Sequence, residues 1–112
     1  MSIMSAFKPI EDINDNLEVQ DLGNLTVDDH NKKTGENLKF VRVVNGLAAS
    51  FSDPISPLGG VLYELVLEAI TTSKINWTYK ARVSKSKAIT PPFHMLYSFQ
   101  SFKPVLEYEH QH

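Results

Sequence analysis

The sequence predicts an α+β domain in which one long N-terminal helix packs across a curved antiparallel sheet of four to five strands. Three observations carry this prediction: one long amphipathic stretch in the first third of the chain, several later stretches of alternating apolar and polar residues, and turn-forming residues between them. A helix and a sheet that are each apolar on one side bury those sides most simply against each other.

The helix is expected to run from about Leu17 to about Lys32. The residues at helical spacing on its apolar side are Val19, Leu22, Gly23 and Thr26. Its charged side carries Asp28, Asp29, Lys32 and Lys33. A side-chain oxygen of Asn14, Asp15 or Asn16 is expected to cap its start, and Gly35 to end it in a left-handed conformation.

Gly23 and Thr26 are unusual members of an apolar stripe. Glycine inside a helix costs about 1 kcal/mol relative to alanine, so we expect a compensating contact. Two small residues one turn apart provide the surface that a close approach of helix and sheet backbones requires, and we interpret them in this way. The alternative is a glycine that is tolerated on an exposed helix.

Four stretches after the helix carry strand signals, at residues 38–44, 61–69, 77–83 and 98–108. The second and third alternate most clearly, with charged residues on one face and aliphatic or aromatic residues on the other. Asn45 and Gly46 are expected to form a turn after the first strand. Pro104 confines the last strand to an edge or a bulge, because proline cannot donate to a ladder.

Residues 47–60 and 84–95 are expected to be irregular connections that carry prolines. In an antiparallel meander, both connections lie at the same end of the sheet as an extended lead-in that runs past the helix start. Three irregular segments on one rim of a rigid sheet are a common arrangement for binding. The expected organisation is an extended segment at 1–14, a domain at 15–108 and a tail at 109–112.

Composition excludes several classes of protein. The 112 residues fit one domain, and the net charge of −2, from 11 basic and 13 acidic residues, argues against nucleic-acid binding. No apolar run is long enough to span a membrane. The absence of cysteine excludes disulfides, a thiol nucleophile and cysteine-ligated zinc. The N-terminus lacks the pattern of a signal peptide, so a cytoplasmic location is the default, with a secreted or vacuolar one if a signal was removed.

No catalytic constellation stands out. Serine, histidine and aspartate are all present, but no spacing points to a triad, and we expect no enzyme activity. No cofactor motif is recognisable and no metal site is expected, since the histidines and glutamates of residues 107–112 fit a polar tail better than a metal site. The expected activity is therefore binding.

The helix sequence LGNLTVDDHN, residues 22–31, resembles the helix pattern of the plant cystatins. The departures are Leu25 in place of an aromatic residue and Thr26 in place of alanine. The stretches NLKFVRVVNG, YELVLEA, YKARV and SFKPV are also similar to the strands of that family, in the same order. The resemblance covers about residues 7 to 105. It implies a cystatin-like fold and inhibition of papain-like cysteine proteases.

The resemblance also implies a three-part wedge that occludes the protease cleft. Where the family has an N-terminal glycine pair, a Gln-x-Val-x-Gly hairpin and a Pro-Trp hairpin, this chain has altered residues, and both connections are longer. The implied protease-binding residues are Ser5, Ala6, Ser56, Pro57, Leu58, Gly59, Gly60, Pro92 and Phe93. A wedge of this kind fills the cleft with close-approaching backbone turns and an apolar anchor.

Two alternatives stay open at this stage. One is a cystatin-fold binding scaffold, natural or engineered, whose longer connections recognise another protein without inhibiting a protease. The other is an inactive relative with a structural or storage role. The chain is expected to be a monomer or a dimer formed by exchange of a hairpin.

Overall fold

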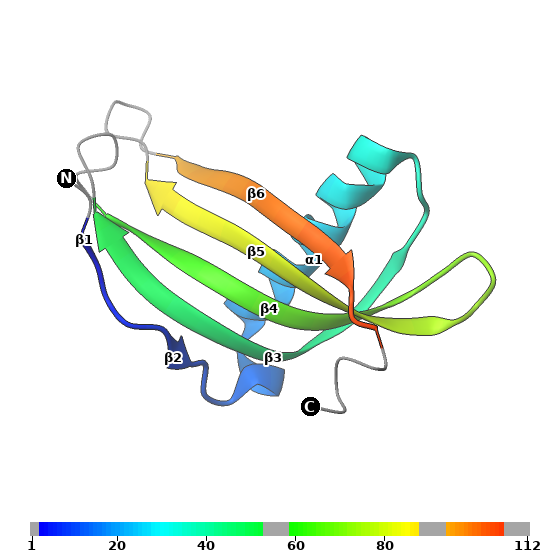
Figure 1. Cartoon of the computed structure of the whole chain (residues 1–112), viewed down its shortest axis with the longest axis horizontal. Coiled ribbons are helices and arrows are strands. Elements are labelled where there is room, and N and C mark those ends of the chain that lie inside the picture. Colours follow the sequence, from blue (N-terminus) through cyan, green and yellow to red (C-terminus); the bar gives the residue numbers. More distant parts are fainter. Residues whose placement is uncertain (1–2, 53–58, 88–93, 107–112) are drawn as a thin grey trace.

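The computed structural model describes residues 3–52, 59–87 and 94–106. The elements in chain order are β1 (Ile3–Met4), β2 (Lys8–Pro9), the short 3-10 helix η1 (Ile13–Asp15), α1 (Leu17–Thr34), β3 (Lys39–Ser52), β4 (Gly60–Ile70), β5 (Asn76–Lys87) and β6 (Met95–Pro104). The strands pair antiparallel in the order β1-β3-β4-β5-β6, and β2 also pairs with β3. Figure 1 shows α1 lying diagonally across one face of this sheet. The predicted α+β architecture is confirmed.

The helix begins and ends where the sequence signals place it. The side chain of Asn16 accepts a hydrogen bond from the backbone N–H of Val19 at 3.1 Å and so caps the first turn. Glu18 lies in the first turn, and Lys32 and Lys33 lie in the last, each favoured by the helix dipole. The helix extends two residues beyond the expected Lys32, to Thr34, and Gly35 follows with a φ of 78°.

Gly23 lies at the closest contact between α1 and the sheet. A Cβ atom at this position would lie 2.5 Å from Cγ2 of Val43 and 2.8 Å from Cε1 of Phe40. Val43 is fully buried in β3, so its side chain has little room to move. Thr26 is also buried, and its hydroxyl donates to the carbonyl of Leu22 at 2.8 Å. The interpretation of Gly23 and Thr26 as a close-packing surface is confirmed.

The side-chain amides of two helix residues join α1 to β3 and to Leu38, the residue just before β3. Gln20 accepts a hydrogen bond from the N–H of Val43 at 2.9 Å and donates to the carbonyl of Val43 at 3.0 Å. Asn31 accepts from the N–H of Leu38 at 3.0 Å and donates to its carbonyl at 2.9 Å. Each side chain therefore satisfies both polar groups of one backbone residue, as a neighbouring strand would.

The core lies between α1 and the facing side of β4 and β5. Alternate residues of these strands are buried, as the period of two predicts. Its buried members include Leu65, Leu67, Tyr79, Ala81 and Val83. Trp77 follows the same alternation but is 40% exposed, near the beginning of β5. Within the described part of the chain, every buried side-chain nitrogen or oxygen has a hydrogen-bond partner.

The expected turn at Asn45 and Gly46 is wrong. β3 continues through both residues to Ser52, and Gly46 pairs with Leu65 of β4. The carbonyl of Gly46 accepts a hydrogen bond from the N–H of Ile10 at 3.0 Å, so neighbours on both sides hold this segment extended. The local irregularity is a shift of register between Val43 and Asn45. Tertiary pairing thus overrides the turn preference of an Asn-Gly pair.

The boundaries of the two expected connections also change. Residues 47–52 belong to β3, residues 84–87 belong to β5, and β6 begins at Met95 rather than residue 98. Lys85, within the second expected connection, instead lies in β5, where its ammonium group donates to Glu18 of α1 at 2.9 Å. Polar strand ends of this kind lack the apolar alternation on which the prediction depends. β6 is an edge strand, as Pro104 predicts, and it ends at Pro104 and not at residue 108 as expected.

We predict that Gly23→Ala lowers the free energy of unfolding by about 1–2 kcal/mol, measured by urea denaturation. Overpacking a rigid core costs typically about 1–3 kcal/mol, which outweighs the gain of about 1 kcal/mol in helix propensity. Asn24→Ala, at the exposed next residue of α1, is the control and is expected to stay within about 0.5 kcal/mol of the wild type. A Gly23→Ala protein that is as stable as the wild type would contradict the close contact.

Candidate protein-binding end of the sheet

The residues next to all three segments that the sequence predicts as a binding rim lie at one end of the sheet. Met4 pairs with Phe51, Phe51 with Gly60, Gly60 with Ser86, and Ser86 with Leu96. These five residues form one continuous row across five strands, which we call the end row. The row lies where β1 pairs with β3, where β3 ends and β4 begins, and where β5 ends and β6 begins, and Figure 1 shows these strand ends together at one end of the sheet.

The N-terminal segment is held to the end row by Ser5. Its N–H donates to the carbonyl of Ser50 at 2.8 Å, and its hydroxyl accepts from the N–H of Ser50 at 2.9 Å. The hydroxyl of Ser50 contacts the same oxygen at 3.2 Å. A glycine at this position would keep only the first of these bonds. Ser5 and the exposed Ala6 therefore sit beside the row on a segment that is fastened to β3.

Gly59 and Gly60 bring the start of β4 against Phe51. A Cβ atom on Gly60 would lie 2.6 Å from Cζ of Phe51 and 2.7 Å from the carbonyl oxygen of Lys85. Gly59 has a φ of 84°, which side chains rarely adopt. Because glycine has no side chain, the Phe51 ring and the β5 backbone can approach the start of β4 closely. Their predicted role in protein contact stays a prediction.

Five of the predicted binding residues lie outside the described residues: Ser56, Pro57, Leu58, Pro92 and Phe93. The structure fixes only the strand residues on either side of them. Gly60 opens β4 after the first group, and Met95 opens β6 after the second. The end row therefore brings the strand ends that flank both groups to the same end of the sheet as Ser5 and Ala6.

The end row is uncharged and partly apolar. Met4 is 54% exposed and Leu96 is 46% exposed, and Phe51 is half-buried between them. Met95 beside the row is also exposed. Exposed methionine, leucine and phenylalanine at the ends of rigid strands can fill an apolar cleft, and they offer no group for acid, base or nucleophilic chemistry.

Two residues of β5, the strand that carries Ser86 of the end row, form ion pairs. The ion pair of Lys85 and Glu18 joins β5 to the first turn of α1, and its hydrogen bond raises the pKa of Lys85. Burial raises the pKa of Tyr63, and the nearby carboxylate of Glu18 raises it further. On the opposite face of the sheet, Arg82 forms an ion pair with Glu64 and lies 5.9 Å from the ring centre of Phe7. These contacts fix the strands that carry the row.

The remaining polar clusters have structural explanations. The ring of His30 stacks on Phe102 with 4.1 Å between ring centres, and its Nε2 lies 3.2 Å from a carboxylate oxygen of Glu36. Among the residues that the structure describes, no group of three or more histidine, aspartate or glutamate side chains could hold a metal ion. In the same part of the chain, no helix is long and apolar enough to cross a membrane.

Sequence reasoning missed the end row itself. Met4, Phe51 and Leu96 were not among the expected binding residues. In the sequence, each of these residues is an apolar residue next to an irregular segment. Only the strand register shows that they are neighbours in space. The bond-forming role of the Ser5 hydroxyl was also missed, because its partner is 45 residues away.

A helix packed across a curved antiparallel sheet, with an N-terminal segment paired to β3 beside the ends of β3, β4, β5 and β6, defines a protein of the cystatin class. A family model described as "Aspartic acid proteinase inhibitor" matches residues 10–103. "Cysteine proteinase inhibitor A" of the sunflower Helianthus annuus is 34% identical over 89 residues, which cover 80% of this chain and 93% of the sunflower protein. The chain belongs to the cystatin family.

We predict that Ser5→Ala releases the N-terminal segment from β3. The loss of the bond to the Ser50 N–H leaves one backbone bond at this point, so the Ser50 amide should exchange with deuterium faster in hydrogen-exchange NMR. Ser50→Ala is the matched control, because it removes the weaker hydroxyl contact and keeps the N–H bond to Ser5. Equal protection of residue 50 in the wild type and in Ser5→Ala would contradict this role.

We also predict that the protein loses stability as the pH rises above about 10, the ordinary pKa of tyrosine. Burial raises the pKa of both Tyr63 and Tyr79 in the folded state. In the unfolded chain these hydroxyls ionise at a lower pH than in the folded protein. Their contribution to the free energy of unfolding is therefore fully present below pH 10 and declines as the pH rises through the folded-state pKa values. The raised pKa of Lys85 acts in the same direction, because its ion pair is lost when it deprotonates.

Urea denaturation between pH 8 and pH 11 (about one unit beyond the ordinary tyrosine pKa) measures this effect. Tyr63→Phe should make the alkaline decline shallower. Tyr97→Phe should change it less, because the charge of Tyr97 contributes less to the raised pKa of Tyr63 than burial and Glu18 do. Parallel curves for all three proteins would show that burial of Tyr63 does not cause the decline.

Proposed function

We propose that this protein is a proteinase inhibitor that inserts the end row and its three adjoining segments into an active-site cleft. The single observation that carries the proposal is the register of the row, in which residues from five strands bring these segments together. The inhibition is reversible occlusion and not catalysis by this chain. The relatives support it, since both are described as proteinase inhibitors.

The physical basis of the inhibition is a rigid, uncharged surface. The strand pairing holds the backbone of Met4, Phe51 and Leu96 in place, so little backbone entropy is lost there on binding. A surface of this kind buries apolar area without presenting a peptide carbonyl for attack. Ser5, by fastening the N-terminal segment to β3, adds to this preorganisation.

Papain-like cysteine proteases are the first target class that we propose. The name of the sunflower relative supports this class, and the match covers nearly all of that protein. In this arrangement the contacts are made by Ser5 and Ala6, by residues 56–60, and by Pro92 and Phe93. Phe93 is the apolar anchor, and Leu58 supplies aliphatic bulk on the other connection.

Aspartic proteinases are the second candidate class. The description of the family model that matches residues 10–103 favours them. The residues themselves also favour a change of target, because all three parts of the cystatin wedge are altered in this chain. A protein that inhibits neither class would instead be a binding scaffold that uses the same end of the sheet.

Titration of a papain-like enzyme and of a pepsin-like enzyme, each with a small peptide substrate, tests the proposal. We predict inhibition of one class with a stoichiometric end point. Phe93→Ala should weaken that inhibition roughly thirtyfold, the effect of losing one anchor residue worth about 2 kcal/mol. Ile75→Ala is the matched control, because Ile75 is 51% exposed and follows β4 at the opposite end of the sheet.

The outcomes are distinct. Inhibition that is insensitive to Phe93→Ala but lost in a variant of residues 56–60 would show that the anchor residue lies between β3 and β4. Full activity of both enzymes at micromolar protein would overturn the inhibitor proposal and leave the scaffold alternative.

A further inference from the structure

The strand β6 forms an open edge of the sheet. It pairs with β5 alone among residues 3–52, 59–87 and 94–106. The opposite edge, along β3, is covered from Val43 to Ser52: β1 and β2 pair with residues 47–52, and the amide of Gln20 pairs with Val43. Among the described residues, β6 is therefore the longest strand edge available for a further strand.

β6 carries few of the devices that usually protect an open edge. Charged side chains and prolines on an edge prevent it from pairing with other chains. Residues 95–102, with the sequence MLYSFQSF, contain neither. The register shift opposite Arg82 and Val83 leaves Gln100 as an extra residue, so the regular part of the edge is the run from Met95 to Phe99.

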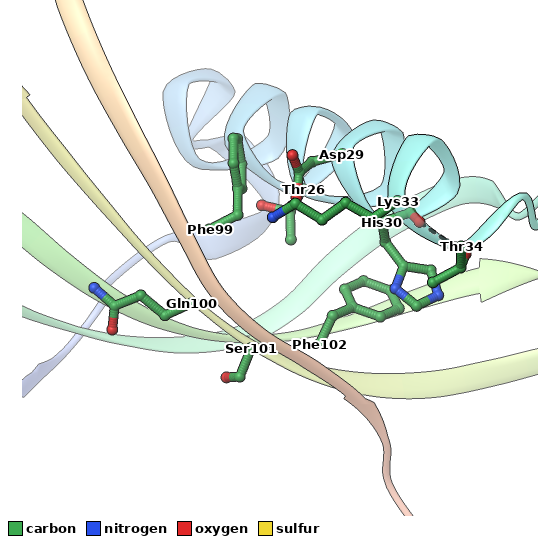
Figure 2. A pocket seen from close by; sticks show the side chains of 9 residues that line it. All are labelled: Thr26, Asp29, His30, Lys33, Thr34, Phe99, Gln100, Ser101 and Phe102. Atoms are coloured by element: carbon green, nitrogen blue, oxygen red, sulfur yellow. Dashed lines mark hydrogen bonds and ion pairs between the residues drawn. The ribbon is translucent and has the colours of Figure 1, made fainter.

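This run also exposes apolar surface beside the helix. Tyr97 is 40% exposed and lines a hollow of about 150 Å³ with Leu22 and Leu25 of α1. Figure 2 shows Phe99 and Phe102 projecting from β6 toward α1, where they line a pocket of about 260 Å³. Lys33 lies over the Phe99 ring at 5.9 Å without closing the pocket. A strand added to β6 would satisfy its backbone groups and cover this surface.

We propose that two copies of this chain pair through β6 to form a two-fold dimer with one continuous antiparallel sheet. The occupant is a second copy because the exposed edge is self-complementary: it is uncharged, rich in aromatic residues, and meets the same sequence when it runs antiparallel to itself. Since the β3 edge is covered from Val43 to Ser52, most of it cannot pair head-to-tail with β6 of another copy, and pairing of β6 with itself closes the assembly at two copies.

Symmetry restricts the register. A two-fold axis perpendicular to the sheet places both helices on the same face. It passes midway between the two strands, where one residue of β6 lies opposite its own copy. Tyr97 is the middle residue of the regular run, so an axis at Tyr97 pairs the largest number of residues. Met95 then lies opposite Phe99 of the second copy, and Leu96 opposite Ser98. Directly opposite aromatic and apolar side chains stabilise such pairs.

Cysteine cross-linking tests the pairing directly, because the chain contains no cysteine. Leu96→Cys, Tyr97→Cys and Ser98→Cys place the thiol at the three central positions. Residues opposite each other in an antiparallel pair have Cα atoms about 4.5–5.5 Å apart, within the range that a disulfide spans. We expect one of the three, Tyr97→Cys, to form a covalent dimer on mild oxidation far faster than Ile75→Cys, the exposed control.

Light scattering over micromolar to millimolar protein gives the second measurement. The wild type should approach twice the monomer mass, Tyr97→Lys and Ser98→Lys should remain monomeric, and Ile75→Lys should behave as the wild type. Circular dichroism confirms that each variant is folded, and Ser98 is exposed, so its replacement leaves the core intact.

A wild type that stays monomeric across the range would overturn the proposal. A dimer that persists in both lysine variants, with no cross-linking above the Ile75→Cys control, would also overturn it and indicate exchange of a hairpin instead. Neither result depends on proteinase inhibition, so this inference and the proposed function fail separately.

Discussion

The contact between Gly23 of α1 and Val43 of β3 is the constraint on which the rest of the fold depends. It lets the helix lie so close to the sheet that the amides of Gln20 and Asn31 reach the backbone of the β3 chain on either side. Helix and strand are thus joined by packing at the centre and by hydrogen bonds at both flanks. The energetic cost of a glycine within a helix is offset by a contact that no larger residue would allow.

This anchoring positions β3 for everything that pairs with it. β3 carries β1 and β2 on one side and β4 on the other, and it extends well beyond the helix to Ser52. The far part of β3 therefore carries the N-terminal segment and Phe51 to the end row. The proposed inhibitory surface is built on strands whose other ends pack under α1, and this packing fixes the relative positions of the strand ends in the end row.

The helix and the architecture were predictable because their signals are local or periodic. Asn16, Gly35 and the stripe from Val19 to Thr26 act within the helix, and the alternation in β4 and β5 survives in the structure. The length of β3 was not predictable, since Asn45 and Gly46 favour a turn in isolation and are held extended by Ile10 and Leu65. For the same reason, the sequence predicted that three segments lie at one end of the sheet but not which residues form the end row. Those residues become neighbours only through the strand register. Ser5 and Gly60 could be named, while Met4, Phe51 and Leu96 could not.

The separation of the end row from the Gly23 contact has an evolutionary consequence. Closing a flexible connection costs only about 0.6 kcal/mol more for each doubling of its length, so the segments between β3 and β4 and between β5 and β6 can lengthen or change composition with little penalty to folding. Relatives described as inhibitors of two mechanistically unrelated proteinase classes match this one chain. A scaffold that is stabilised at one place and binds its target at another can acquire new targets through sequence changes in these two segments alone.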